Sequence, residues 1–143
     1  MPEQLDSRLV NLLHGQRRGV LATLRRNGRP QLSTVAYAYE PDTRRIRIST
    51  TDGSAKVSNL RRNSTAAFHA STPDGWSYAV ADASAELTAV ADQPDDAVVD
   101  ELVEIYRAIA GEHPDWQEFR EAMVAERRVV LRLHVEHIYG LVR

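Results

Sequence analysis

The sequence predicts an α+β protein built on a small antiparallel β-barrel of six to seven strands, with peripheral helices. Apolar and polar residues alternate with a period of two in several short segments, which is typical of half-buried strands. Only a few turn residues separate most of these segments, which favours antiparallel pairing. Antiparallel strands in this number tend to close on themselves, because closure removes exposed edges. The length suits a single domain over residues 1–143.

The first part of the chain predicts a helix followed by a hairpin. Leucines recur at helical spacing over residues 5–13, and an apolar strand follows over residues 19–24. Asn27-Gly28 then predicts a tight turn, since both positions of a two-residue hairpin turn need a positive φ. The return strand is expected to run without interruption over residues 30–39.

The middle of the chain continues the sheet around one short helix. Residues near Asp82 are expected to form a bend or bulge between two strand segments. The predicted elements are a strand over 44–49, a helix over 55–62, a strand over 65–70, and strand segments over 76–80 and 83–89.

The last third of the chain is mainly helical. A stripe of apolar residues and Pro94 in the first turn predict a helix over residues 94–110. Gly111 ends this helix, and Pro114 opens a second one. A long final strand is expected over residues 128–139, where apolar and polar residues alternate.

Composition excludes several classes of function. A net charge of −2 and a pI near 6.2 argue against nucleic-acid binding, which usually needs a basic domain. The sequence contains no cysteine, so it predicts neither disulfides nor thiol chemistry. No apolar run approaches membrane-spanning length, and Met1 begins no signal peptide. We therefore expect a cytoplasmic protein that does not contact a membrane.

One stretch predicts a site for an anion. The strand over residues 44–49 leads through the turn residues 50–54 into a helix, and Lys56 lies in the first turn of that helix. The start of a helix presents free backbone N–H groups at the positive end of its dipole. The stretch could therefore hold a phosphate or carboxylate. An ordinary capped helix with solvated charges would give the same pattern.

Side-chain catalysts are not predicted. Neither Ser33 nor Ser77 carries the sequence signature of an activated serine. His134 and His137 lie three positions apart on a predicted strand and so face opposite ways, which argues against a metal pair. We therefore expect no catalytic side chain and no metal.

Four motifs in order carry a resemblance to a known family. They are Gly19-Val20-Leu21-Ala22-Thr23, Asn27-Gly28-Arg29-Pro30-Gln31-Leu32-Ser33, Ala55-Lys56-x-x-Asn59-Leu60-Arg61-Arg62 and Gly75-Trp76-Ser77-Tyr78. Together with the helical region 94–125, these motifs resemble the split β-barrel flavin/deazaflavin oxidoreductases, the superfamily of pyridoxamine 5′-phosphate oxidase. The chain is most similar to the actinobacterial branch that binds the deazaflavin coenzyme F420.

The resemblance implies a homodimer with cofactor sites at the subunit interface. It places the cofactor ring against β-strand residues and its phosphate-bearing side chain at the strand end and helix start. A third group of residues would close the site, from the same or the other subunit. The implied cofactor-binding residues are Gln31, Ser33, Thr34, Val35, Ser49, Thr50, Ser54, Lys56, Asn59, Trp76, Ser77 and Tyr78.

The chain departs from this family pattern at one position. Relatives often carry an arginine just before the Ala-Lys pair, where this chain has Ser54. A two-pronged contact to the anion is then missing. Lys56 and the turn N–H groups would have to suffice, or Arg61 or Arg25 would have to help.

The resemblance implies an oxidoreductase. Reduced F420 would deliver a hydride to a small unsaturated substrate, and the protein would supply orientation and electrostatics. One alternative is an FMN-binding enzyme of the pyridoxamine 5′-phosphate oxidase type. Another is a cofactor carrier of the same fold that catalyses nothing.

Overall fold

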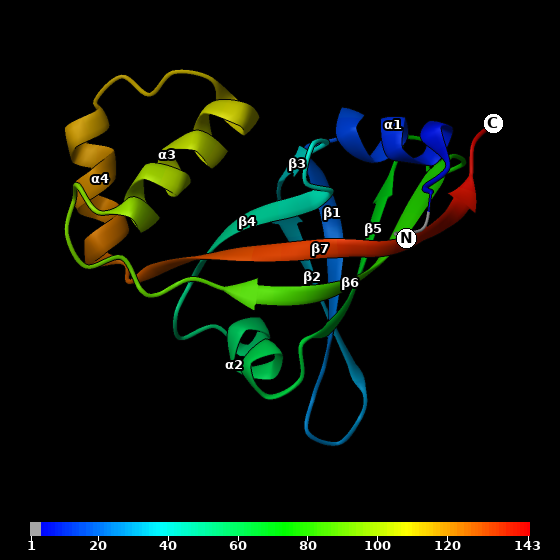
Figure 1. The fold of residues 1–143 in the computed structure, drawn as a ribbon, viewed down its shortest axis with the longest axis horizontal. Coiled ribbons are helices and arrows are strands. Elements are labelled where there is room, and N and C mark those ends of the chain that lie inside the picture. Colours follow the sequence, from blue (N-terminus) through cyan, green and yellow to red (C-terminus); the bar gives the residue numbers. More distant parts are fainter. Residues whose placement is uncertain (1–3) are drawn as a thin grey trace.

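The structure, a computed structural model, describes residues 4–143. Over this range the chain forms one seven-stranded antiparallel sheet and four helices, and the sheet curls into the predicted barrel (Figure 1). The fold class predicted from the sequence is confirmed. The helices are α1 (Ser7–Gly15), α2 (Ala55–Arg62), α3 (Ala97–Ala110) and α4 (Trp116–Ala125); the strands are β1 (Arg18–Leu24), β2 (Pro30–Ala36), β3 (Ala38–Glu40), β4 (Arg45–Thr51), β5 (Thr65–Ser71), β6 (Tyr78–Leu87) and β7 (Arg128–Leu141).

The order of the strands describes how the sheet curls. The order is β2-β1-β5-β6-β7-β4-β3, so consecutive strands β2 and β3 form its opposite edges. The single strand predicted over 30–39 is therefore wrong, because the chain changes pairing partner at Tyr37. The Tyr37 N–H donates to the Arg17 carbonyl (3.0 Å), and its hydroxyl donates to the Leu13 carbonyl. Its buried ring lies edge-to-face against Phe68, with centroids 4.6 Å apart.

The predicted hairpin forms between β1 and β2, but its turn is longer than expected. The Arg25 N–H donates to the Arg29 carbonyl and the Gly28 N–H to the Arg25 carbonyl, both at 2.9 Å. Among the loop residues 26–28, all within the described range, Gly28 alone has a positive φ, of 82°. This is a three-residue loop that ends in a left-handed glycine, a common hairpin type.

The irregularity expected near Asp82 is present, but it lies in the neighbouring strand. Strand β6 runs unbroken from Tyr78 to Leu87, so the prediction of two segments is wrong. Asp82 pairs with His137 and Ala83 pairs with Val135. Glu136 is therefore the extra residue, and the bulge belongs to β7.

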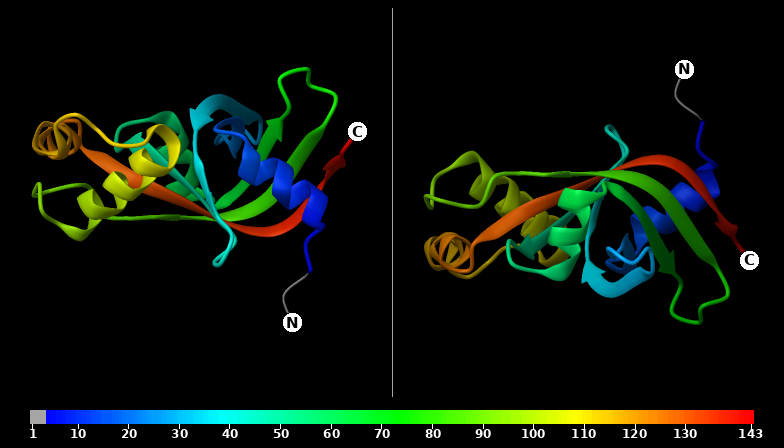
Figure 2. Two further views of the ribbon diagram at one scale, coloured as in Figure 1. Left: turned by 90° about the horizontal axis from the view of Figure 1, so that it is seen from above. Right: turned by 90° about the horizontal axis from the view of Figure 1, so that it is seen from below.

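Two clusters of buried side chains stabilise the fold. In the first, Leu9 and Leu13 of α1 pack into the curled sheet against residues such as Phe68. In the second, α3 and α4 pack on each other and on Val130 of β7. Figures 1 and 2 place α1 at one end of the sheet and the α3–α4 pair at the other.

The helices are all short. None in the described part of the chain is long and apolar enough to cross a lipid bilayer.

Candidate functional site

A cavity of about 490 Å³ lies where β2, β4, α2 and the start of β7 meet. We call it the polar cavity, because hydroxyl and cationic side chains line much of it. Ala36, Thr51 and Ile109, the last from the end of α3, complete its wall. The residues that carry its chemistry are Thr34, Val35, Ser49, Thr50, Lys56 and Arg128.

Strand β4 and helix α2 place the polar groups of this cavity. Ser49 and Thr50 lie near the end of β4, and the chain then turns into α2, whose first turn carries Lys56. Ser54 is the N-cap residue, yet its side chain makes no capping hydrogen bond to α2. Its hydroxyl lies 3.3 Å from that of Thr50 instead. The backbone N–H groups at the start of α2 therefore donate no hydrogen bond to the cap side chain and are suited to donate to an anion.

Arg128 is a second cation of the polar cavity, and sequence reasoning missed it. It pairs with Thr51 across the β4–β7 ladder, which brings the start of β7 beside the end of β4. Its Nε and Nη2 donate to Glu126 Oε1 at 3.0 and 2.8 Å. The guanidinium and this carboxylate form an ion pair. No local sequence pattern could have placed Arg128 in the cavity, because its position depends on the register between β4 and β7, which are distant in sequence.

The two arginines proposed from the sequence lie elsewhere. Arg61 forms an ion pair with Asp52, and hydrogen bonds from Arg61 and then Arg127 hold the pKa of the Asp52 carboxyl below its ordinary value. Arg25 lies on the β1–β2 hairpin and donates to the Pro30 carbonyl at 3.4 Å. Neither arginine lines the polar cavity.

Five of the predicted site residues gather in the polar cavity, and Ser54 adjoins them through Thr50. Ser33 lies two residues before Val35 on β2 and pairs with Leu21, so it shares the face of Val35 without lining the cavity. The five that gather are Thr34, Val35, Ser49, Thr50 and Lys56.

Asn59 and Gln31 hold parts of the fold together. The buried Asn59 amide donates to Thr23 Oγ1 (3.1 Å) and to Gln31 Oε1 (2.8 Å). Arg62 in turn donates to Asn59 Oδ1 at 3.3 Å. These bonds join α2 to β1 and β2, and neither Asn59 nor Gln31 lines the polar cavity. In this chain their amides position α2.

Trp76, Ser77 and Tyr78 lie apart from the polar cavity, in the β5–β6 turn and the start of β6 (Figure 1). Ser77 Oγ accepts the Arg143 N–H at 2.9 Å, and the Arg143 guanidinium carbon lies 5.5 Å from the centroid of the Trp76 ring. The Tyr78 ring stacks on the His69 ring, with the two ring centroids 5.7 Å apart. The C-terminal residue therefore packs on this turn and not on the polar cavity.

A second cavity, of about 260 Å³, adjoins the first beneath α3 and α4. We call it the apolar cavity. The two cavities share Ala36, Ser49, Ile109 and Arg128, so they form one continuous hollow with a polar and an apolar part. Its remaining lining is mostly apolar: Leu102, Ile105, Tyr106, Ala110, Phe119 and Met123.

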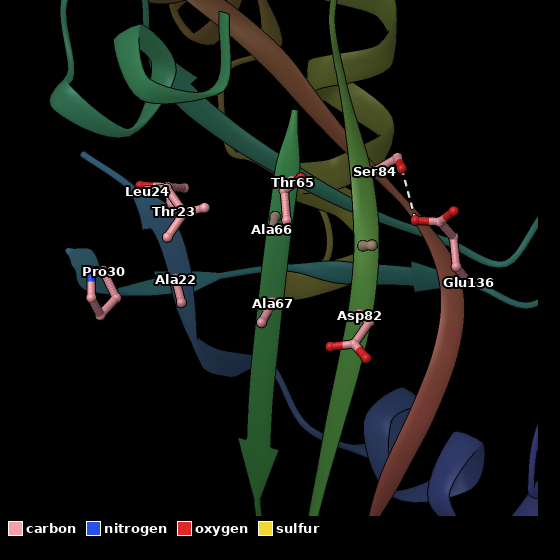
Figure 3. A pocket seen from close by; sticks show the side chains of 11 residues that line it. Ala22, Thr23, Leu24, Pro30, Thr65, Ala66, Ala67, Asp82, Ser84 and Glu136 are labelled. Carbon is pink, nitrogen blue, oxygen red and sulfur yellow. Dashed lines mark hydrogen bonds between the residues drawn. The ribbon is translucent and has the colours of Figure 1, made fainter. Parts of the chain in front are cut away.

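A third cavity, of about 350 Å³, lies beside the β7 bulge and is acidic. Figure 3 shows the Ser84 hydroxyl donating to Glu136 Oε1 at 2.7 Å, with Asp82 on the same strand as Ser84. No lysine or arginine is among the residues that line this cavity. Its charge is wrong for an anionic ligand, so it is not the predicted site.

The outer face of β2, β1, β5 and β6 carries an apolar hollow of about 290 Å³. Leu32 is 65% exposed there, unlike the inward-facing Leu21 and Phe68, which are fully buried. Val20, Ala22 and Val80 lie around it.

Over residues 4–143, a curled antiparallel sheet of seven strands with four peripheral helices defines a class of protein, the split β-barrels. The chain belongs to the pyridoxamine 5′-phosphate oxidase family, whose model matches residues 5–141. This match confirms the resemblance to the pyridoxamine 5′-phosphate oxidase superfamily that the sequence motifs indicated.

Solved structures share this fold. A conserved hypothetical protein, Rv2991 from Mycobacterium tuberculosis, matches with a TM-score of 0.74 and 20% identity over 97% of this chain and 85% of that one. An F420 reductase matches at 0.63 and 22% identity over 97% and 98% of the two chains. The heme storage protein HutZ from Vibrio cholerae matches at 0.66 and 14% over 96% and 95%. At these identities the likeness concerns the fold alone.

Proposed function

We propose that this protein is an F420-dependent oxidoreductase that transfers a hydride from reduced deazaflavin to a small unsaturated substrate. The polar cavity is the observation that carries the proposal. It combines two cations, Lys56 and Arg128, with the hydroxyls of Thr34, Ser49 and Thr50. Such a set of charge-assisted and hydroxyl hydrogen bonds suits a phosphate group.

The residues present fit an anionic redox cofactor. Lys56, Arg128 and the start of α2 would hold its phosphate, and Val35 would lie against its ring. When bound, the cofactor supplies the carbon that carries the hydride. The chain binds and orients it, and the helical pair above the adjoining apolar cavity keeps water away from the reacting atoms. This division of labour needs no nucleophilic side chain.

We further propose a homodimer with two cofactor sites at the interface. The exposed Leu32 and the apolar hollow around it offer a surface for a second copy. Trp76, Ser77 and Tyr78 lie away from the polar cavity of their own chain, so only a partner could bring them to a cofactor.

The cytoplasmic location also stays a prediction.

An FMN-dependent enzyme is the second candidate. The family takes its description from pyridoxamine 5′-phosphate oxidase, and the polar cavity would suit the phosphate of FMN equally well. A cofactor carrier without catalysis is the third. We do not propose heme binding, because heme iron commonly takes a histidine ligand and the residues lining the two joined cavities include no histidine.

A side-by-side titration separates these candidates. The purified protein is titrated with F420 and with FMN while tryptophan emission is followed. Quenching by F420 but not by FMN supports the proposal, whereas tight binding of FMN alone replaces it with the flavin enzyme. Consumption of reduced F420 is then measured over a panel of conjugated carbonyl compounds. Binding of F420 without turnover of any compound would favour the carrier.

A further inference from the structure

We propose that the apolar cavity beneath α3 and α4 binds the uncharged, mainly hydrocarbon body of the substrate, one or two flat rings in size. This inference rests on the proposed function where it calls the ligand a substrate. Binding of the ligand to the cavity can be measured without the cofactor. The cavity is separate enough from the cation-lined part to have its own ligand chemistry, and close enough to serve the same reaction.

The lining of the apolar cavity selects against charge. Leu102 and Ile105 are each 1% exposed, and Phe119 and Met123 are 9% and 8% exposed. The polar side-chain atoms near it come from Ser49, Tyr106 and Arg128, two of which it shares with the polar cavity. A cation in this cavity would lose its hydration without gaining a partner, because no aspartate or glutamate is among the described residues that line it, and an anion would find a partner only in Arg128 at the junction with the polar cavity. An uncharged ligand avoids this loss.

The volume sets the size of the ligand. An engineered apolar cavity of about 150 Å³ is large enough to bind benzene. At about 260 Å³, this cavity has room for one ring with substituents or for two fused rings. Met123 contributes an unbranched, adaptable side chain that can fit ligands of different outline.

The position of the apolar cavity explains why a ligand there would serve the proposed reaction. Ala36, Ser49, Ile109 and Arg128 line both cavities, so ligands in the two parts would touch. Transfer between bound groups requires reacting atoms about 3–3.5 Å apart. Ser49 stands at this junction, where its hydroxyl can bond a polar oxygen at the edge of an otherwise apolar ligand.

Ala110 offers a way to close the apolar cavity without disturbing the core. It is an exposed residue at the end of α3 and lines the apolar cavity but not the polar one. Ala110→Phe should fill the entrance. Ala108→Phe makes the same change at an exposed position of the same helix that lines neither cavity. Thermal unfolding of both variants verifies that they fold.

The test measures binding of 2-naphthol, uncharged at pH 7, and of 2-naphthylmethylammonium, a cation of similar shape, by fluorescence titration of the intact protein. We expect 2-naphthol to bind at least tenfold more tightly than the cation, because no acidic side chain of residues 4–143 is among those that line either cavity. Ala110→Phe should weaken binding of 2-naphthol at least tenfold, whereas Ala108→Phe should leave it unchanged. No binding of 2-naphthol, or equal effects of the two variants, would overturn the proposal.

Adding F420 separates this inference from the proposed function. If saturating F420 leaves 2-naphthol bound, the two ligands occupy different parts of the hollow, as proposed. If F420 displaces 2-naphthol competitively, the apolar cavity belongs to the cofactor ring and the inference is wrong. If F420 fails to bind while 2-naphthol still responds to Ala110→Phe, the proposed function fails and the site for an uncharged ring stands.

Discussion

Lys56 and Arg128 line the same cavity, although one lies in the first turn of α2 and the other begins β7. The pairing of Thr51 with Arg128 brings the two elements together. This arrangement supplies a second cation to the polar cavity. Lys56 is also the only lysine of the sequence, which makes it easy to follow chemically.

Replacing Lys56 by alanine should weaken binding of F420. Loss of one charge-assisted contact to the anion corresponds to about 1–3 kcal/mol. The measurement is the dissociation constant from fluorescence titration, with Arg25→Ala as the control, because Arg25 lies on the hairpin outside the cavity. In the wild-type protein, F420 should also protect Lys56 from acylation by an amine-reactive reagent, as read by mass spectrometry. Unchanged affinity and unchanged acylation would remove Lys56 from the site.

Replacing Arg128 and replacing Glu126 should change the affinity for F420 in opposite directions. Arg128→Ala should weaken cofactor binding by about 1–3 kcal/mol, as expected for a charge-assisted hydrogen bond. Glu126 accepts two hydrogen bonds from Arg128 and offsets part of its charge. Glu126→Gln keeps an acceptor oxygen but removes the negative charge, so it should tighten binding by up to about 1 kcal/mol, the scale of an exposed ion pair. Weaker binding in Glu126→Gln would mean that the carboxylate mainly positions Arg128.

Asn59→Ala should lower the free energy of unfolding rather than the affinity for the cofactor. Its buried amide bonds Thr23 and Gln31, and removing it leaves polar groups without their partner, at a cost of about 1–3 kcal/mol. Urea unfolding of Asn59→Ala, Gln31→Ala and the double variant measures the coupling between the two side chains. Normal stability combined with lost cofactor binding would return Asn59 to the site, as the family resemblance implied.

Local patterns in the sequence predicted most elements of this fold. The helix predicted over 55–62 has the same bounds as α2, because its turn residues and its apolar face are both local signals. The break at Tyr37 could not be predicted in this way. The break depends on a hydrogen bond from the Tyr37 N–H to the Arg17 carbonyl and on the packing of the Tyr37 ring against Phe68. Only the curled sheet brings these residues close together.

The residues of the polar cavity also differ in how far local sequence patterns could predict them. Ser49, Thr50 and Lys56 were predicted together because strand end, turn and helix start are contiguous in the chain. Arg128 was missed because its place depends on the β4–β7 register. The cofactor contact of Asn59 stays a prediction, and the structure adds what a motif cannot show, that its amide donates hydrogen bonds to Thr23 and Gln31 on neighbouring strands.

Leu32 should decide the oligomeric state. We expect the wild-type protein to have twice the 16.0 kDa mass of one chain in light scattering coupled to gel filtration. Leu32→Asp places a charge on the proposed interface and should give the mass of a single chain. Because Leu32 is 65% exposed, the substitution should hardly change the stability of the barrel itself. Leu32→Met is the control and should stay dimeric; a dimer in Leu32→Asp would place the interface elsewhere.

Protonation of Glu101 should lower the free energy of unfolding at acidic pH. Burial favours its neutral form, but hydrogen bonds and charge from Arg132, with the charge of Arg47, outweigh burial and hold the Glu101 pKa below its ordinary 4.5. The stabilisation is thus full above about pH 4.5 and is lost as pH falls through the lowered pKa. Glu101→Gln should lower the unfolding free energy at pH 7 by about 1–3 kcal/mol and flatten its fall in acid. Urea unfolding from pH 7 to pH 3 measures both effects, and the exposed Glu104→Gln should change them less; equal curves for the two variants would contradict this account.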